Sequence, residues 1–201
     1  MLKVRIPVYY DYASSLSYIA ARVMERLDGQ IDATLLWKGV QIVRRHGGWK
    51  NGEVIDTDSK GKIIRVSRET GIPLRIPHTW LDSTYALEAA EFAKDQKVFL
   101  PFHNAVFKAI FEDERDIADL NVVLDIARSV GLPSTELRLL LQSGGLTHHV
   151  LATEREAESF GILGYPTFLL GDFPLIGIQP ADTMRLLLTR YIYKSRKTPG
   201  H

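Results

Sequence analysis

The sequence predicts an α/β fold in which two small strand-containing units enclose an all-helical block. Three observations predict it: a strand, a helix and a second strand follow one another in residues 2–37; helical spacing dominates residues 75–160; and two short strands precede a last helix after Gly161. A βαβ unit and a ββα unit therefore lie at the two ends of the chain. We expect residues 1–50 and 160–201 to form one domain, into which residues 51–159 are inserted as a helical domain.

The N-terminal unit begins with apolar residues that alternate with charged ones over residues 2–8. This alternation predicts a strand, which Pro7 weakens by removing one backbone donor. Apolar residues then recur every three or four positions over residues 16–27, which predicts a helix, and Ser14 is a suitable N-cap for it. Residues 31–37 form the second strand, and the helical connection makes the two strands parallel.

The middle of the chain consists of helical segments separated by turn and cap residues. Apolar spacing predicts helices at Leu81–Ala93, Phe102–Phe111, Leu120–Val130, Leu137–Leu141 and Val150–Phe160. After Gly161 the spacing returns to that of strands, because residues 166–170 and 173–178 flank Gly171-Asp172, a two-residue hairpin signal. Apolar positions from Met184 to Ile192 then predict an amphipathic last helix.

Composition narrows the classes of function. The 201 residues are 45% hydrophobic, enough for a full core, and the formal net charge of +1 indicates no preference for nucleic acid or a membrane surface. No signal sequence or run of about 18 apolar residues occurs, so we expect no membrane partner and a cytoplasmic location. The chain has no cysteine, and disulfide exchange therefore cannot run through its own residues.

Two short segments carry the most specific information: Tyr10-Asp11-Tyr12-Ala13-Ser14-Ser15-Leu16-Ser17-Tyr18 and Gly164-Tyr165-Pro166-Thr167-Phe168. The first places Ser14 and Ser17 at the start of the predicted helix, and the second places Pro166 directly before a predicted strand. This layout resembles the DsbA-like disulfide oxidoreductases, in which a Cys-x-x-Cys motif begins the helix and a distant x-Pro loop faces it. Ser14 and Ser17 occupy the positions of the two cysteines, so the scaffold resembles a redox protein that lacks redox chemistry.

The resemblance covers nearly the whole chain and implies a thioredoxin-like fold, βαβ plus ββα, with an inserted all-helical domain. Within the superfamily, the chain resembles the Ser-for-Cys branch of 2-hydroxychromene-2-carboxylate isomerases and kappa-class glutathione transferases. The Ser-Pro-x-Ser motif of that branch corresponds to Ser14-Ser15-Leu16-Ser17 here, without its proline. The branch implies glutathione as the cofactor and a small carboxylic acid as the substrate. Kappa-type relatives form dimers, so the resemblance also implies a homodimer.

Ser14 is the candidate catalytic residue. Free backbone N–H groups and the positive end of the helix dipole favour an anion at a helix N-terminus. In the resembling enzymes a hydroxyl at this position donates to the sulfur of glutathione, which lowers the pKa of that thiol. Ser17 lies one turn further along and is a candidate for cofactor binding. The alternative is that Ser14 is only an N-cap and Ser17 only a polar residue of the first turn.

The x-Pro segment is the candidate peptide-binding edge. The resemblance implies a cis bond between Tyr165 and Pro166, which turns the backbone of Tyr165 toward the active site, where it would pair with peptide-like glutathione. The branch holds the γ-glutamyl end with residues that follow a glycine before the last helix, and Gln179 or Asp182 would serve here. The sequence Gly177-Ile178-Gln179-Pro180 is, however, more similar to the Cys-containing DsbA branch.

A basic segment between residues 38 and 68 is the candidate carboxylate site. Arg44 lies close to the position at which the isomerases have a substrate-binding lysine, and its guanidinium suits bidentate binding of a carboxylate. The alternative is a solvated charged loop. The adjacent His148 and His149 point in different directions, and no His, Asp or Glu set has the spacing of a metal site, so we expect no metal.

The leading hypothesis is a glutathione-dependent isomerase or transferase of small aromatic or α,β-unsaturated acids. In the implied mechanism Ser14 stabilises the glutathione thiolate, which adds reversibly to a conjugated double bond. Tyr12, Trp37, Trp80 and Tyr85 are candidates for an apolar substrate pocket or for plain core positions. The alternative is a DsbA-family homologue that has lost Cys-x-x-Cys and binds an extended peptide or a thiol without catalysis. No sequence feature predicts nucleic acid as a partner.

Overall fold

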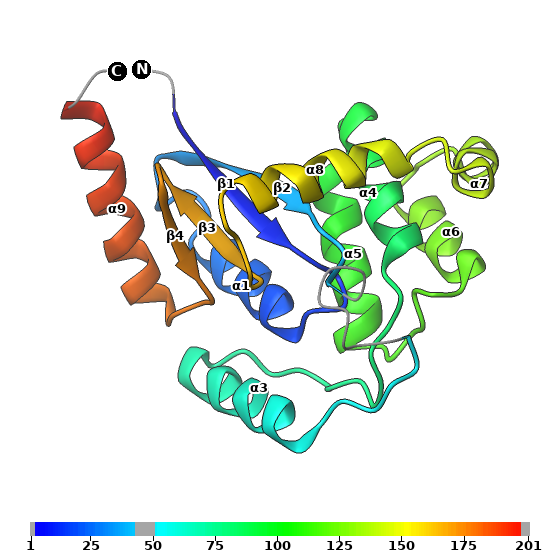
Figure 1. The fold of residues 1–201 in the computed structure, drawn as a ribbon, viewed down its shortest axis with the longest axis horizontal. Helices are drawn as coiled ribbons and strands as arrows, with labels where there is room; N and C mark the ends of the chain where they lie inside the picture. The colour runs from blue at the N-terminus through cyan, green and yellow to red at the C-terminus, as the bar shows by residue number, and fades with distance from the viewer. Residues whose placement is uncertain (1–2, 43–50, 198–201) are drawn as a thin grey trace.

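The computed structural model describes residues 3–42 and 51–197, which form one four-stranded sheet and its surrounding helices (Figure 1). The sheet has the order β2-β1-β3-β4, with β1 at Val4–Tyr10, β2 at Ala33–Gly39, β3 at Thr167–Leu170 and β4 at Phe173–Ile176. Strand β1 pairs in parallel with β2 and antiparallel with β3, and β3 pairs antiparallel with β4. The predicted βαβ and ββα units are confirmed, and they share one sheet.

Strand β1 shows how Pro7 is tolerated in the centre of this sheet. β1 pairs with β2 along its whole length, whereas its pairing with β3 is restricted to Val8 and Tyr9. Pro7, which has no N–H group, directly precedes these two residues, so β3 pairing is absent where the backbone donor is missing. The N-terminal strand therefore keeps the predicted position despite its proline.

Helices cover both faces of the sheet. Helix α1 (Ser15–Arg26) packs in one core cluster with Val8 and Tyr10, whereas Tyr9 belongs to a second cluster with Ala157 of helix α8 (Thr147–Ser159). Adjacent residues of β1 therefore face opposite layers, as the pleat requires. On the α8 side, Glu156 accepts a hydrogen bond from the Tyr9 hydroxyl at 2.7 Å and pairs with Lys38 at 2.6 Å. The last helix, α9 (Ala181–Lys197), lies beside β4 (Figure 1).

The helical block contains the segments that apolar spacing predicted, with shifts of a few residues at their ends. The structure places α4 at Thr84–Asp95, α5 at Phe99–Phe111, α6 at Leu120–Ser129, α7 at Ser134–Ser143 and α8 at Thr147–Ser159. Helix α5 contributes Phe102, Phe107 and Phe111 to the same core cluster as β1 and α1. The strand-containing part and the helical block therefore share buried side chains, while the predicted division into two domains stays a prediction.

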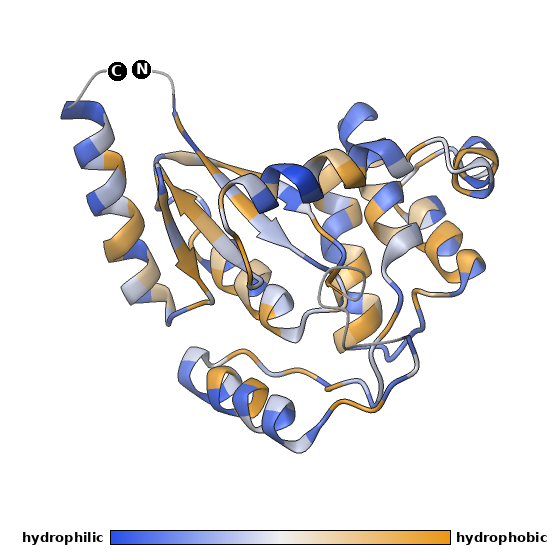
Figure 2. Ribbon diagram, in the orientation of Figure 1, coloured by the Kyte–Doolittle hydropathy of each residue, from blue (hydrophilic) through white to orange (hydrophobic). Residues whose placement is uncertain are grey.

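Helix α3 (Thr57–Thr70) was missed, because the basic segment between residues 38 and 68 was interpreted as a loop. Figure 2 shows that α3 is mostly hydrophilic, and only Ile63 and Thr70 are buried. Its ends are well defined instead: Asp56 caps the first turn by accepting from the Ser59 amide at 2.7 Å, and Gly71 ends the helix at φ +65°. The capping residues specify this helix, although its apolar spacing is weak.

None of the helices in residues 3–42 and 51–197 has both the length and the apolar composition that crossing a bilayer requires.

Candidate functional site

Ser14 joins the beginning of α1 to the segment before β3. As the N-cap of α1, its hydroxyl oxygen accepts a hydrogen bond from the Ser17 amide at 3.2 Å. The same hydroxyl donates to the carbonyl oxygen of Tyr165 at 3.4 Å, and Ser14 is only 5% exposed. This hydrogen bond joins residues that lie 151 positions apart in the sequence. It brings the two predicted segments of the site into contact.

The Tyr165–Pro166 peptide bond is cis, which confirms the predicted conformation. Hydrogen bonds fix both sides of this bond: the Thr167 hydroxyl donates to the Gly164 carbonyl at 2.6 Å, and the Gly177 amide donates to the Pro166 carbonyl at 2.7 Å. Gly164 has no room for a larger side chain, because a Cβ atom there would lie 2.9 Å from Ile176. The segment before β3 is thus held rigidly against the turn that precedes α9.

The N-terminus of α1 favours an anion. The first turn contains no acidic residue, so no side chain of the helix neutralises the positive end of its dipole. The hydroxyl of Ser14 can donate to an incoming anion after rotating away from the Tyr165 carbonyl. This end of α1 therefore suits a bound thiolate, and the chain itself contains no cysteine that could supply the sulfur.

Asp11 is a buried residue in the turn that precedes α1, and no role for it was predicted from the sequence. Its carboxylate accepts hydrogen bonds from the amides of Ala13 and Ile42, and the Ala13 bond measures 2.9 Å. Burial raises the pKa of Asp11 to about 6, although these bonds and the nearby Ser83 hydroxyl favour the charged form. The Ser83 oxygen itself has no partner in hydrogen-bonding geometry among the described residues. An Asp that accepts from the amide two positions later is a typical Asx turn, and this was the available sequence signal.

Ser17 lies inside the protein, away from the surface of the site. Its side chain is fully buried, and its hydroxyl oxygen accepts a hydrogen bond from the Asp11 amide at 3.4 Å. Together with the Ser17 amide, which donates to Ser14, this bond fixes the turn that presents Ser14. Ser17 therefore contacts the turn that precedes α1. Binding of a cofactor by Ser17 stays a prediction.

The remaining predicted ligand-binding residues are less closely connected to Ser14. Gln179 and Asp182 are exposed at the beginning of α9, where Asp182 lies 3.3 Å from Arg185. The bond from Gly177 to the Pro166 carbonyl connects this end of α9 to the cis-proline segment. Arg44 lies outside the described residues.

The candidate pocket aromatics occupy different environments. Tyr12, Trp37 and Trp80 are buried, whereas Tyr85 is partly buried. The Tyr12 hydroxyl lies 3.1 Å from Nδ1 of His103, which is surrounded by aromatic rings. Burial lowers the pKa of His103 well below its ordinary value, so the ring is neutral. No role for His103 was predicted from the sequence, in which its position among the apolar residues of α5 was the available signal.

The sequence matches the family described as DSBA-like thioredoxin domain over residues 5–189. It is also similar to the uncharacterized protein YwbO of Bacillus subtilis (strain 168), with 24% identity over 195 residues, which cover 90% of this chain and 94% of that protein. Both matches extend over nearly the whole chain, so the strand-containing ends and the helical block belong to one shared architecture.

Solved structures share the fold at low sequence identity. A 2-hydroxychromene-2-carboxylate isomerase has a TM-score of 0.77 at 19% identity, with coverage of 96% of this chain and 97% of that chain. A probable DsbA oxidoreductase from Streptomyces coelicolor has a TM-score of 0.77 at 21% identity, covering 98% and 92%. The cytosolic disulfide reductase DsbM from Pseudomonas aeruginosa, solved with GSH, has a TM-score of 0.69 at 16% identity, covering 94% and 100%. These likenesses confirm the predicted thioredoxin-like α/β fold.

Proposed function

The chain belongs to the DSBA-like thioredoxin domain family, and from this premise we propose that it is a glutathione-dependent isomerase or transferase of a small aromatic or α,β-unsaturated carboxylic acid. The observation that carries the proposal is the buried hydroxyl of Ser14 at the N-terminus of α1, next to the carbonyl of Tyr165. A hydroxyl donor at a helix N-terminus stabilises a thiolate but cannot form a disulfide. The reactive sulfur must therefore come from a bound molecule.

The donor set fits the cysteinyl part of glutathione. When bound, glutathione would supply a thiolate nucleophile that adds to a conjugated double bond, and this bond would become single, rotate and re-form when the thiolate leaves. Ser14 donates a hydrogen bond to the sulfur and lowers the pKa of the thiol. The backbone of Tyr165, fixed by the cis bond to Pro166, aligns the peptide.

Other residues have supporting roles in this proposal. Asp11 and Ser17 position Ser14, because both make hydrogen bonds within the turn that precedes α1. Gln179 or Asp182 binds the γ-glutamyl end, and Arg44 binds the carboxylate of the substrate. Among the solved structures that share the fold, one is an isomerase of a carboxylic acid and another was solved with GSH, and both precedents favour this class of ligand.

A second candidate function is non-catalytic binding of an extended peptide at the same edge. Large apolar side chains are exposed near the cis-proline segment, with Leu163 72% and Ile176 56% exposed. Strand β4 is also an edge strand, to which a further strand could add. Such a protein would bind peptides through main-chain bonds and would not distinguish a free thiol from a blocked one.

Isothermal titration calorimetry with reduced glutathione and S-methylglutathione tests the proposal. We expect glutathione to bind at micromolar to millimolar concentrations with release of a proton, which measurements in two buffers of different ionisation enthalpy would detect. S-methylglutathione should bind more weakly, because its sulfur cannot ionise. If neither compound binds, the proposal is wrong; equal binding of both without proton release would favour the peptide-binding function.

Variants of adjacent serines assign the effect to Ser14. Ser14→Ala should weaken glutathione binding about tenfold and remove the proton release, because a charge-assisted hydrogen bond to the sulfur is lost. Ser15→Ala is the matched control: its side chain is equally buried, and it makes no side-chain hydrogen bond within the described residues. Unchanged binding and proton release in Ser14→Ala would remove Ser14 from the mechanism.

A further inference from the structure

A cavity of about 420 Å³ lies between α1, β2 and α5, far from Ser14 along α1. It is lined by Met24 and Glu25 at the C-terminal end of α1 and by Asp28 just after it, whereas Ser14 caps the N-terminal end. β2 contributes Ala33, Thr34, Leu35 and Trp37, and α5 contributes Leu100, His103 and Asn104. The volume lies within the range of small-molecule sites in proteins. The cavity is therefore separate from the proposed glutathione site.

The charges around this cavity are asymmetric. Its lining contains the carboxylates of Glu25 and Asp28 but no lysine or arginine. Glu25 is paired with Arg22 at 2.7 Å, whereas Asp28 is exposed and has no ion pair among the described residues. The lining therefore carries one carboxylate, that of Asp28, without an ion pair in the described part of the chain.

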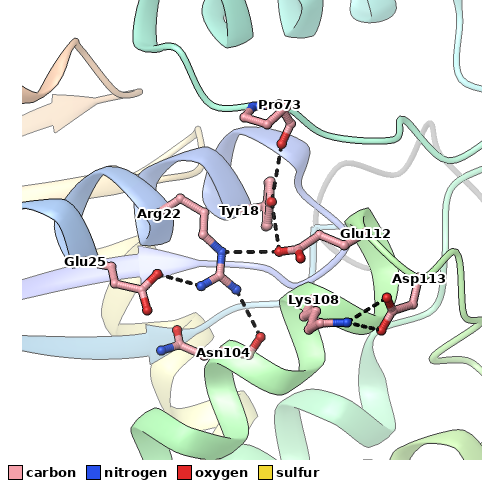
Figure 3. Close-up of polar contacts among 8 residues, drawn as sticks. All are labelled: Tyr18, Arg22, Glu25, Pro73, Asn104, Lys108, Glu112 and Asp113. Carbon is pink, nitrogen blue, oxygen red and sulfur yellow. Dashed lines mark hydrogen bonds and ion pairs between the residues drawn. The ribbon is translucent and has the colours of Figure 1, made fainter.

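The wall of the cavity is held in place by contacts between α1 and α5. Arg22 binds Glu25 and also donates to the main-chain carbonyl of Asn104 at 3.1 Å, so two lining residues are fixed by one guanidinium (Figure 3). Leu35, Met24 and Trp37 give the interior an apolar surface. A rigid apolar wall with a charged opening is typical of a site for an amphiphilic ligand.

His103 provides an unused polar group in this wall. The residue is 1% exposed, Nδ1 lies 3.1 Å from the Tyr12 hydroxyl, and Nε2 has no partner among the described residues. The nearby cations Lys94 and Arg22 also lower the pKa of His103 and keep the ring neutral, so Nε2 is free to bond a neutral group. Buried nitrogens in native proteins are nearly always bonded to protein or to ordered water, so a water molecule or a polar ligand atom would satisfy Nε2 here.

We propose that this cavity binds a small primary amine with an aromatic or apolar body. The ammonium group pairs with the Asp28 carboxylate at the opening, and the apolar body packs on Trp37 and Met24. An anionic ligand of the same shape is repelled by the carboxylate of Asp28, which has no ion pair among the described residues.

Titration of the ¹⁵N-labelled protein with 2-phenylethylamine tests this assignment by NMR. We expect shifts of the Trp37 indole and of amides in residues 33–37 and 100–104, with saturation at millimolar concentrations. Phenylacetate, the anionic counterpart, should bind at least about tenfold more weakly. Absence of shifts at these residues, or equal binding of amine and acid, would overturn the proposal and leave the cavity to solvent.

Two variants separate the charge from the cavity. Asp28→Asn should weaken binding of the amine about fivefold without affecting binding of neutral 2-phenylethanol. Asp172→Asn, in the turn between β3 and β4, should change the binding of neither compound.

Ala33→Trp, at the beginning of the edge strand β2, should fill the cavity and abolish binding of both compounds. Binding that survives Ala33→Trp would place the amine elsewhere and contradict the proposal. Ser14→Ala should leave amine binding intact, so this test is independent of the glutathione proposal.

Discussion

At the scale of single residues, Ser14 shows how one oxygen atom can organise a site. It accepts from the Ser17 amide and donates to the Tyr165 carbonyl, and the carboxylate of Asp11 holds the same turn from below through the Ala13 amide. These contacts combine a helix N-terminus with a fixed peptide group. Any anion bound here meets the positive end of α1 without a competing acidic side chain in the first turn.

Replacement of Ser14 by cysteine measures this electrostatic effect directly, since the chain has no other thiol. In Ser14→Cys we expect a thiol pKa below the ordinary value of about 8.5, because the N-terminus of α1 favours the thiolate. Ser129→Cys, at the C-terminal end of α6, is the matched control and should have a pKa at or above that value. Thiolate absorbance as a function of pH gives both values. A pKa in Ser14→Cys no lower than in the control would contradict the electrostatic assignment.

Asp11 predicts a pH dependence of stability. Its pKa is raised from 3.8 to about 6, so the folded state binds more protons than the unfolded state in this window, and stability falls as pH rises through it. Relative to Asp11→Asn, the wild-type protein should lose about 2 kcal/mol of unfolding free energy between pH 4 and pH 7. Urea denaturation across this range measures the difference, with the exposed Asp95→Asn as a control. A constant difference between wild type and Asp11→Asn would show that Asp11 does not titrate as inferred.

At the scale of elements, α1 and α5 are connected by a polar cluster (Figure 3). Arg22 binds Glu25, the Asn104 carbonyl and, at 3.7 Å, Glu112. Tyr18 extends the same cluster, since its hydroxyl lies 3.1 Å from Glu112 and 3.3 Å from the Pro73 carbonyl. Helix α1, which Ser14 caps, is thereby attached to the helical block at two successive turns.

Arg22→Met tests the energetic weight of this connection. Methionine keeps the apolar stem but leaves the Asn104 carbonyl and two carboxylates without their partner, and we expect a loss of about 1–2 kcal/mol in unfolding free energy. Arg128→Met removes an exposed arginine from a comparable pair with Asp125 and should cost less than about 0.5 kcal/mol. Chemical denaturation of the two variants gives the comparison. Equal losses would mean that the α1–α5 cluster contributes no more than a surface ion pair.

A comparison of the elements shows which parts of the fold can be predicted from sequence patterns. The strands, α1 and the helices from α4 onward follow from apolar spacing, because each buries one face. Helix α3 was missed because it buries little and depends on its caps, Asp56 and Gly71. Ser14 and the cis bond before Pro166 were predicted from short motifs. The buried sites of Asp11 and His103 were not predicted, because their surroundings come from distant segments.

At the scale of the whole molecule, the burial of His103 makes the free energy of unfolding depend on pH in the acid range. It lies in the continuous aromatic core formed by β1, β2 and α5, and its pKa is lowered well below the ordinary value by burial. As pH falls below about 6.5, the unfolded state binds a proton that the folded state does not, so stability decreases. Asp11 acts with the opposite sign in an overlapping pH range, and only differences between variants can separate the two.

His103→Gln should therefore reduce the acid sensitivity of the protein. Relative to this variant, we expect the wild type to lose stability below about pH 6.5 with a limiting slope of about 1.4 kcal/mol per pH unit. The exposed His78→Gln is the matched control and should leave the profile unchanged. Unfolding free energies measured from pH 7.5 down to pH 4.5 check this. Parallel profiles for wild type and His103→Gln would be inconsistent with a neutral buried imidazole.

Sequence patterns specify the α/β order of the elements, and they predict that Ser14 and Pro166 belong to one site in a chain whose 201 residues include no cysteine. These features depend on local spacing and residue type, which a linear pattern contains. The tertiary structure decided that the Ser14 hydroxyl meets the Tyr165 carbonyl, that Ser17 is turned inward, and that Asp11 and His103 are buried. The cavity between α1, β2 and α5 likewise depends on how these three elements pack together. Burial and hydrogen bonding between segments as many as 151 positions apart depend on how the elements pack, and no local pattern specifies that packing.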